Sequence, residues 1–248
     1  ANFIRNFGDL NNLGEQYFRR GGSSSTQEEF YRTIRDQLQA TTEKGAVNNV
    51  GFIRAANENL DATLELLKVQ TDPQANPLPD ESLFGNSGFS NQCRDAARII
   101  NAPVLDTQFL YVEQGGYDTH SGELANLTNR LDDWNEGIGA LYENVRQMGR
   151  LADVIFVTMA DFGRTTFMNG SGGTDHGHSS PWLMFGGAIS GGIKTPAPTL
   201  AELTSGGSWI RDVHVQFPSL LRQIVEGIGF NGEQIFPGYS ATNLPLFR

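Results

Sequence analysis

Cysteine and long apolar runs are nearly absent from this chain of 248 residues. The single cysteine, Cys93, excludes an internal disulfide, and the apolar spacing around it is typical of a small buried helix residue. No apolar run approaches the roughly 20 residues that cross a bilayer, and no signal peptide is recognisable. A membrane span is therefore not expected. The sequence begins at Ala1 without an initiator Met, so Ala1 is interpreted as a processed start.

Basic residues are scarce as well. The chain has 28 acidic and 18 basic residues, which gives a formal net charge of −10. Proteins that bind the phosphates of nucleic acids need clustered Lys and Arg, so nucleic acid is not expected as a partner. The hydrophobic content of 38% and the length are typical of a globular protein with a sizeable core.

Histidine is scarce but informative, because three of the four histidines lie in two glycine-rich segments, 115–120 and 172–178. Neutral imidazole and carboxylate are standard ligands of zinc and related divalent ions, and glycine lets the backbone turn tightly enough to aim them at one point. The pattern predicts a divalent metal site with the candidate ligands Asp118, His120, Asp175, His176 and His178.

A third polar loop, 161–166, follows an apolar run and contains Asp161 and Arg164. Asp161 is a further candidate ligand and catalytic residue, and the planar fork of Arg164 suits a tetrahedral anion. Asp and Gly are also ordinary turn residues, so a purely structural interpretation of Asp118 and His120 stays open. His214 lacks such polar neighbours and is interpreted as a helix-start or structural residue.

We expect one continuous domain made of a helical segment over 1–70, a Pro/Gly-rich loop over 71–90 and an α/β core over 91–248. In the helical segment, apolar residues recur at three- and four-residue spacing, which is typical of core packing. The positions that carry this pattern are Phe30, Ile34, Leu38, Val50, Ile53, Leu60, Leu64 and Leu67.

Helices and strands alternate in the expected core. A strand at 107–112, a long helix at 121–149 and a strand at 154–159 predict a parallel βαβ unit, in which Trp134 and its leucine neighbours pack on the sheet. Sites in such sheets lie beyond the carboxyl ends of the strands, where His120 and Asp161 would meet. The remaining expected elements are helices over about 91–101 and 215–228 and a strand at 182–185.

The chain carries four motifs in a fixed order: Tyr-Asp-Thr-His at 117–120, Asp-Phe-Gly-Arg-Thr at 161–165, Asn-Gly at 169–170 with Gly-Thr-Asp-His-Gly at 173–177, and Gly-Gly-Ala-Ile-Ser-Gly-Gly at 186–192. Together they resemble the sulfatase-like family catalogued as domain of unknown function 1501. That family is placed in the alkaline phosphatase superfamily. The resemblance covers roughly residues 90 to 240 and is weaker over the helical first third.

The resemblance implies an α/β fold, a parallel-sheet alkaline-phosphatase-like sandwich preceded by a helical segment, and a divalent metal such as zinc, magnesium, manganese or calcium. By that likeness, Asp118 and His120 correspond to an Asp and His pair on one metal, and His176 to the superfamily's final metal histidine. Asp161 occupies a strand end that usually shows an Asp-His pair. Phe162 stands where that histidine is expected, which puts a complete second metal site in doubt.

The superfamily's nucleophile and first metal Asp lie upstream of its helical region. The chain is therefore expected to bind metal but to hydrolyse generic aryl esters poorly. Its expected partners are an anionic ester substrate or an upstream N-terminal fragment.

Three functions stay open: a metal-dependent hydrolase of phosphate or sulfate esters, a non-catalytic structural protein that retains the fold, and metal-free binding of a carbohydrate or anion. A secreted, periplasmic or cell-surface location is expected.

Overall fold

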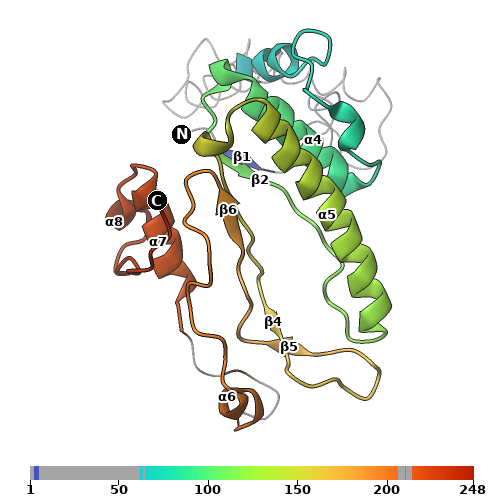
Figure 1. Cartoon of the computed structure of the whole chain (residues 1–248), viewed down its shortest axis with the longest axis vertical. Helices are drawn as coiled ribbons and strands as arrows, with labels where there is room; N and C mark the ends of the chain where they lie inside the picture. Colours follow the sequence, from blue (N-terminus) through green and yellow to red (C-terminus); the bar gives the residue numbers. More distant parts are fainter. Residues whose placement is uncertain (1–2, 6–61, 64, 206–209, 211–213) are drawn as a thin grey trace, which may run out of the picture. The chain divides into compact units, whose positions relative to one another are not determined.

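The computed structural model describes residues 3–5, 62–63, 65–205, 210 and 214–248 (Figure 1). The chain divides into two compact units. The first unit comprises Ala1–Gln114 and Asp132–Met148, and the second comprises Gly115–Leu131 and Gly149–Arg248. Most of the helical segment expected over 1–70 lies outside the described residues. Residues 62–63 and 65–70 are helical, and Leu67 is buried as its position in the apolar pattern predicts, but residues 3–5 form a strand, so the expectation is wrong there.

Two helices carry the core of the first unit (Figure 1). Helix α4, Gly88–Asn101, begins where the Ser87 side chain accepts a hydrogen bond from the Ser90 backbone N–H, a standard N-cap. It buries Cys93 completely, which confirms the interpretation of the lone cysteine. The short 3₁₀ helices η3, Glu81–Leu83, and η4, Pro103–Leu105, flank α4.

Helix α5, Glu123–Gln147, confirms the expected long helix but not its full apolar stripe. Its buried residues begin at Gly137, where an added Cβ would lie 3.0 Å from the Phe89 ring and 3.2 Å from Cys93 Sγ, so α4 and α5 pack closely there. Leu124 and Leu131 are exposed and Trp134 is only partly buried. The expectation that the stripe is buried along the whole helix is therefore wrong for the first half of α5.

The strands form three small sheets of two strands each within the described residues. Strand β1, Phe3–Arg5, pairs in parallel with β2, Phe109–Tyr111, in the first unit. In the second unit β3, Ile155–Val157, pairs with β6, Met184–Gly186, and β4, Gly163–Arg164, pairs with β5, His176–Gly177. Both of these pairs are antiparallel. The fold thus mixes helices and strands, as expected.

The expected parallel pairing of the core strands is wrong for this structure. In the second unit β3 pairs antiparallel with β6, so the strands expected at 154–159 and 182–185 are not parallel neighbours. Two neighbouring parallel strands need a long connection between them, which is usually a helix. Residues 158–183, which connect β3 to β6, contain only the β4 and β5 ladder, turns and extended chain. The chain therefore reverses and returns antiparallel to β3.

Short elements complete the second unit. They are the 3₁₀ helix η5, Leu151–Asp153, and the helices α6, Leu200–Ser205, α7, Phe217–Gly227, and α8, Gly232–Ile235. Helix α7 confirms the helix expected near the C-terminus, while β1, β4, β5, α6 and α8 were not predicted. No helix within the described ranges combines the length and apolar character required to cross a bilayer.

Candidate metal centre

The second unit brings together the two glycine-rich segments and the 161–166 loop. In the β4 and β5 ladder Arg164 lies opposite His176, and a bridge between Ser121 and Gly172 joins the segment that carries His120 to the second glycine-rich segment. The Thr174 backbone N–H also donates to the carbonyl of Thr119 at 3.2 Å. Hydrogen bonds between loops, rather than the edge of one parallel sheet, therefore assemble the site.

Glycine makes these close approaches possible. A Cβ on Gly173 would lie 2.3 Å from the carbonyl oxygen of Thr119, and one on Gly177 would lie 2.5 Å from the carbonyl oxygen of Arg164. Real side chains cannot approach backbone atoms so closely, so only glycine fits at these two positions. The sequence pattern of glycine beside His and Asp thus has a direct steric reason.

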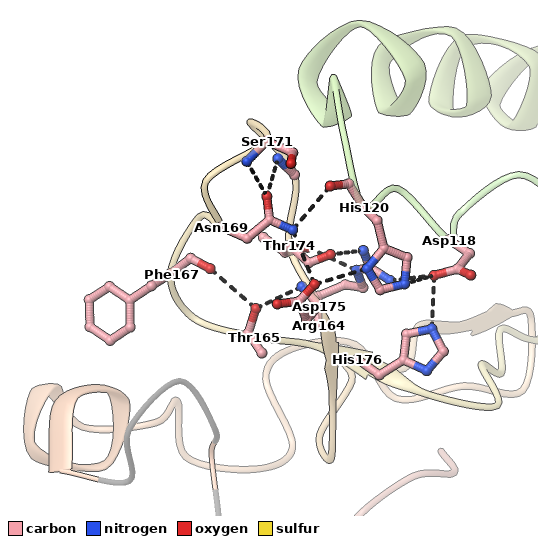
Figure 2. Close-up of polar contacts among 11 residues, drawn as sticks. Asp118, His120, Arg164, Thr165, Phe167, Asn169, Ser171, Thr174, Asp175 and His176 are labelled. Atoms are coloured by element: carbon pink, nitrogen blue, oxygen red, sulfur yellow. Dashed lines mark hydrogen bonds and ion pairs between the residues drawn. The ribbon is translucent and has the colours of Figure 1, made fainter.

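One oxygen lies at the centre of the site (Figure 2). Oδ1 of Asp118 is 2.9 Å from His120 Nε2, 2.8 Å from His176 Nε2 and 2.9 Å from Arg164 Nη1. The hydrogen bonds from His176 and then from Arg164 hold the pKa of Asp118 below its ordinary value, since they stabilise the charged carboxylate. Asp118 is therefore an anion on which three nitrogens converge.

The donor atoms fit one divalent ion. A ligand atom from each of Asp118, His120 and His176 lies within 4.8 Å of the other two. Zinc binds nitrogen and oxygen ligands at about 2.1 Å, so atoms this close need only small side-chain rotations to share one ion. Each of the three side chains is about half exposed, with values from 51 to 54%, so an ion has access from solvent.

A second carboxylate holds the other face of His120. Asp175 Oδ1 lies 2.9 Å from His120 Nδ1. The same oxygen accepts a hydrogen bond from Asn169 Nδ2 at 3.1 Å, and Asn169 Nδ2 also donates to the backbone carbonyl of His120 at 3.0 Å. The bond from His120, followed by the one from Asn169, lowers the pKa of Asp175. The His120 ring is thus contacted at both of its nitrogens.

Phe162 has a visible role in the site. Its ring stacks on the imidazole of His176, with centroids 4.0 Å apart and planes 9° from parallel. The Cζ atom of Arg164 lies 5.6 Å from the centroid of the same ring. In the resemblance Phe162 stood only for a missing histidine, whereas the structure makes it a packing surface for His176.

Arg164 is occupied by protein atoms in this structure. Besides its contact with Asp118, its Nε donates to Thr174 Oγ1 at 2.8 Å and its Nη2 donates to the Thr174 carbonyl. The Arg164 side chain is only 20% exposed. Its observed contacts therefore orient Asp118 and the 172–178 segment.

A comparison with known protein families shows to which family the chain belongs. The family model described as "Protein of unknown function (DUF1501)" matches residues 10–246. The chain belongs to this family. No curated protein and no solved structure matches the chain. All the residues of the metal centre lie inside the part of the chain that matches the DUF1501 family.

The remaining residues that the sequence offered as candidates for the site lie outside the three-residue ligand group of Asp118, His120 and His176. Asp161 and His178 are exposed and do not belong to that group. His214 Nε2 lies 3.3 Å from a carboxylate oxygen of Glu202, an ion-pair geometry that agrees with a structural role.

Sequence reasoning missed Asn169. Asn169-Gly170 belongs to the motifs that carry the family resemblance, but that resemblance gave Asn169 no role in the site. The structure shows instead that the Asn169 amide joins His120 to Asp175.

Proposed function

We propose that this protein binds a divalent metal ion through Asp118, His120 and His176 and is a metal-dependent hydrolase of phosphate or sulfate esters. The observation that carries the proposal is the convergence of two imidazole nitrogens on one carboxylate oxygen, from segments 56 and 58 residues apart in sequence, counted as 176 − 120 and 176 − 118. Two nitrogens and one oxygen suit zinc or a related transition ion better than calcium or magnesium, which prefer oxygen ligands.

The number of ligands supports a catalytic rather than a closed structural site. Structural zinc sites use four protein ligands, whereas catalytic sites use three and leave one position for water or substrate. When bound, such an ion lowers the pKa of a coordinated water and polarises an ester oxygen. His120 and His176 bind as neutral rings, Asp118 supplies negative charge, and Arg164 keeps Asp118 in place.

The charge balance supports an anionic substrate. Neutral imidazoles add no charge, so Asp118 and Asp175 together neutralise a divalent ion, and Arg164 leaves one positive charge in the site. Phosphate and sulfate esters are anions, so their charge is opposite in sign to this residual positive charge. The order of the motifs supports the same substrate class, because it resembles a sulfatase-like family. We extend the proposal to an alkaline-phosphatase-like arrangement of the core, on the strength of that resemblance.

A second candidate is a secreted or surface structural protein that retains the family's fold without catalysis. One observation favours it. The side chains of Asp118, His120, Asp175 and His176 are all more than half exposed, whereas catalytic sites usually exclude water from the reacting groups. A metal bound at such a site would stabilise the loops.

Metal analysis and a hydrolysis assay separate the candidates. The purified chain is dialysed against zinc, manganese, magnesium or calcium, its metal content is measured by mass spectrometry, and turnover of p-nitrophenyl phosphate and sulfate is followed. His176→Ala removes a ligand, and His178→Ala is the matched control two positions away. We expect one zinc or manganese per chain, lost in His176→Ala and kept in His178→Ala, with slow turnover that follows the metal.

Each outcome has a distinct meaning. Metal-dependent turnover that His176→Ala abolishes supports the hydrolase. Stoichiometric metal without any turnover favours the structural protein. A wild-type chain that retains no metal overturns both.

A further inference from the structure

The His120 ring lies between two carboxylates. Its Nε2 is 2.9 Å from Asp118 Oδ1 and its Nδ1 is 2.9 Å from Asp175 Oδ1. An ionised carboxylate is only an acceptor, so each of these contacts needs a proton or a metal ion between the two atoms. A neutral imidazole carries one proton, and it can satisfy one carboxylate at a time.

The surroundings decide which nitrogen keeps the proton. Nε2 lies in the three-residue ligand group with His176, where a cation can bind. Nδ1 faces Asp175 alone, and Asp175 is not a member of that group. A proton on Nδ1 therefore satisfies Asp175 and leaves the Nε2 lone pair for an ion shared with Asp118.

Asp175 is itself held in a fixed orientation. Asn169 Nδ2 donates to its Oδ1 and to the carbonyl of His120, while Asn169 Oδ1 accepts from the backbone N–H groups of Ser171 at 2.9 Å and Gly173 at 3.1 Å (Figure 2). With two donors on its oxygen and two acceptors on its nitrogen, the amide cannot be flipped without losing all four bonds.

The backbone of Asp175 is fixed as well. Its N–H donates to Thr165 Oγ1 at 3.0 Å, and its carbonyl accepts from the Thr165 N–H at 2.9 Å. These two bonds fix the backbone from which the side chain extends, and the bonds from His120 and Asn169 hold the carboxylate itself. Asp175 is placed to orient a ligand and not to be one.

We infer that Asp175, oriented by Asn169, is a positioning residue that holds His120 with its proton on Nδ1 and its Nε2 free to bind the metal ion. The inference rests on the proposed function, because it assigns a partner to one ligand of that site. Metal-binding histidines commonly donate their other nitrogen to a carboxylate, which fixes the ring and raises its basicity.

The competing interpretation is a purely structural ion pair. In that case a doubly protonated His120 would join the two carboxylates and hold the loops together, and Asp175 would influence folding but not metal affinity. The two interpretations differ in the dependence of metal affinity on Asp175.

Cobalt titration and nitrogen NMR test the inference on the whole chain. Co²⁺ replaces zinc and reports ligand number through its visible absorption, and ¹⁵N shifts of the His120 ring report which nitrogen is protonated. The variants are Asp175→Ala, which removes the acceptor, and Asp175→Asn, whose amide oxygen still accepts from Nδ1. Asp153→Asn is the matched control, an exposed aspartate of the same unit that pairs with Arg150.

We expect Asp175→Ala to weaken Co²⁺ binding by roughly 10- to 100-fold, the usual cost of losing such a partner. Asp175→Asn should restore part of the loss, and Asp153→Asn should bind as the wild type does. In the zinc-bound wild type, the ¹⁵N shifts should show the metal on Nε2 of His120 and the ring proton on Nδ1. Thermal unfolding of each variant checks that the fold is kept.

The failures are distinguishable. If the wild type does not bind Co²⁺, the metal site and the inference both fail. If the wild type binds Co²⁺ and Asp175→Ala binds it equally well, only the inference fails. Zinc bound to Nδ1 of His120 instead of Nε2 in the wild type also overturns it.

Discussion

Different kinds of contact stabilise the interior of each of the two compact units. Around α4 and the second half of α5, apolar side chains are fully buried, and Cys93 and Val145 have no exposed surface. In the metal centre the side chains of Asp118 and His176 are more than half exposed, and hydrogen bonds between loops set their positions. The first region can be stable without any ligand, whereas the second has a geometry that a cation would complete.

The contrast also runs along one helix. Leu141, in the first unit, is buried, whereas Leu124, in the second, is 84% exposed although it belongs to the same apolar pattern. Apolar periodicity predicts a helix reliably, but it does not tell how much of the stripe is covered. Variants that contrast the two regions follow, from the largest expected effect to the smallest.

Leu141→Ala should destabilise the protein by roughly 2 to 5 kcal/mol, because it removes buried methyl groups and leaves a cavity. Leu124→Ala, on the same helix, should change stability by less than about 0.5 kcal/mol, because its side chain is already in water. Urea unfolding followed by circular dichroism measures both. Equal effects of the two substitutions would show that the first half of α5 is covered in solution.

Gly173→Ala should destabilise the site loops by roughly 1 to 3 kcal/mol, since the new Cβ would overlap the backbone at Thr119. The loops that carry His120 and Asp175 would move apart, and metal affinity would fall with them. Gly170→Ala is the matched control in the same loop, because its Cβ would have nothing within 4 Å. Calorimetric metal titration compares the two, and unchanged affinity in Gly173→Ala would contradict the steric argument.

Phe162→Leu should weaken metal binding by roughly two- to tenfold, the equivalent of losing one aromatic stack. The ring of Phe162 keeps His176 oriented, and leucine cannot stack in the same way. Phe167→Leu, in the same loop, serves as the control because the Phe167 ring points away from the ligand group (Figure 2). A loss in both variants would indicate general loosening of the loop.

Cys93 should not react with thiol reagents in the native protein at pH 8. Burial, and secondarily the charge of Asp133, raises the pKa of its thiol to about 12, so the reactive thiolate is not formed. Because the folded pKa is raised, the neutral thiol favours the native state at neutral pH, and this contribution is lost as pH rises toward 12. Labelling with a chromogenic disulfide in native buffer and in guanidinium measures this. Full labelling without denaturant would contradict the buried position.

Helices α4 and α5 and the candidate ligands could be foreseen because their signals are local. The three- and four-residue spacing predicted α4 and α5, and the concentration of histidine beside glycine and aspartate pointed to Asp118, His120 and His176. The antiparallel return of β6 on β3 could not be foreseen, since strand direction depends on the path of the connecting loops.

The roles within the candidate site were also hidden from the sequence. Asp118 and Asp175 both precede a histidine in a glycine-rich segment, and only their contacts show that one lies among the ligand atoms and the other behind His120. Asn169 and Phe162 act through orientation, which no motif encodes. Composition identifies donor atoms, and geometry assigns what each one faces.

The most direct test of the account is the position of zinc in crystals of the whole chain, from anomalous diffraction at the zinc absorption edge. The account predicts one strong peak about 2.1 Å from Asp118 Oδ1, His120 Nε2 and His176 Nε2. It also predicts that Asp175 stays hydrogen-bonded to His120. A zinc peak bound directly to Asp175, a peak elsewhere on the chain, or no peak at saturating zinc would contradict it.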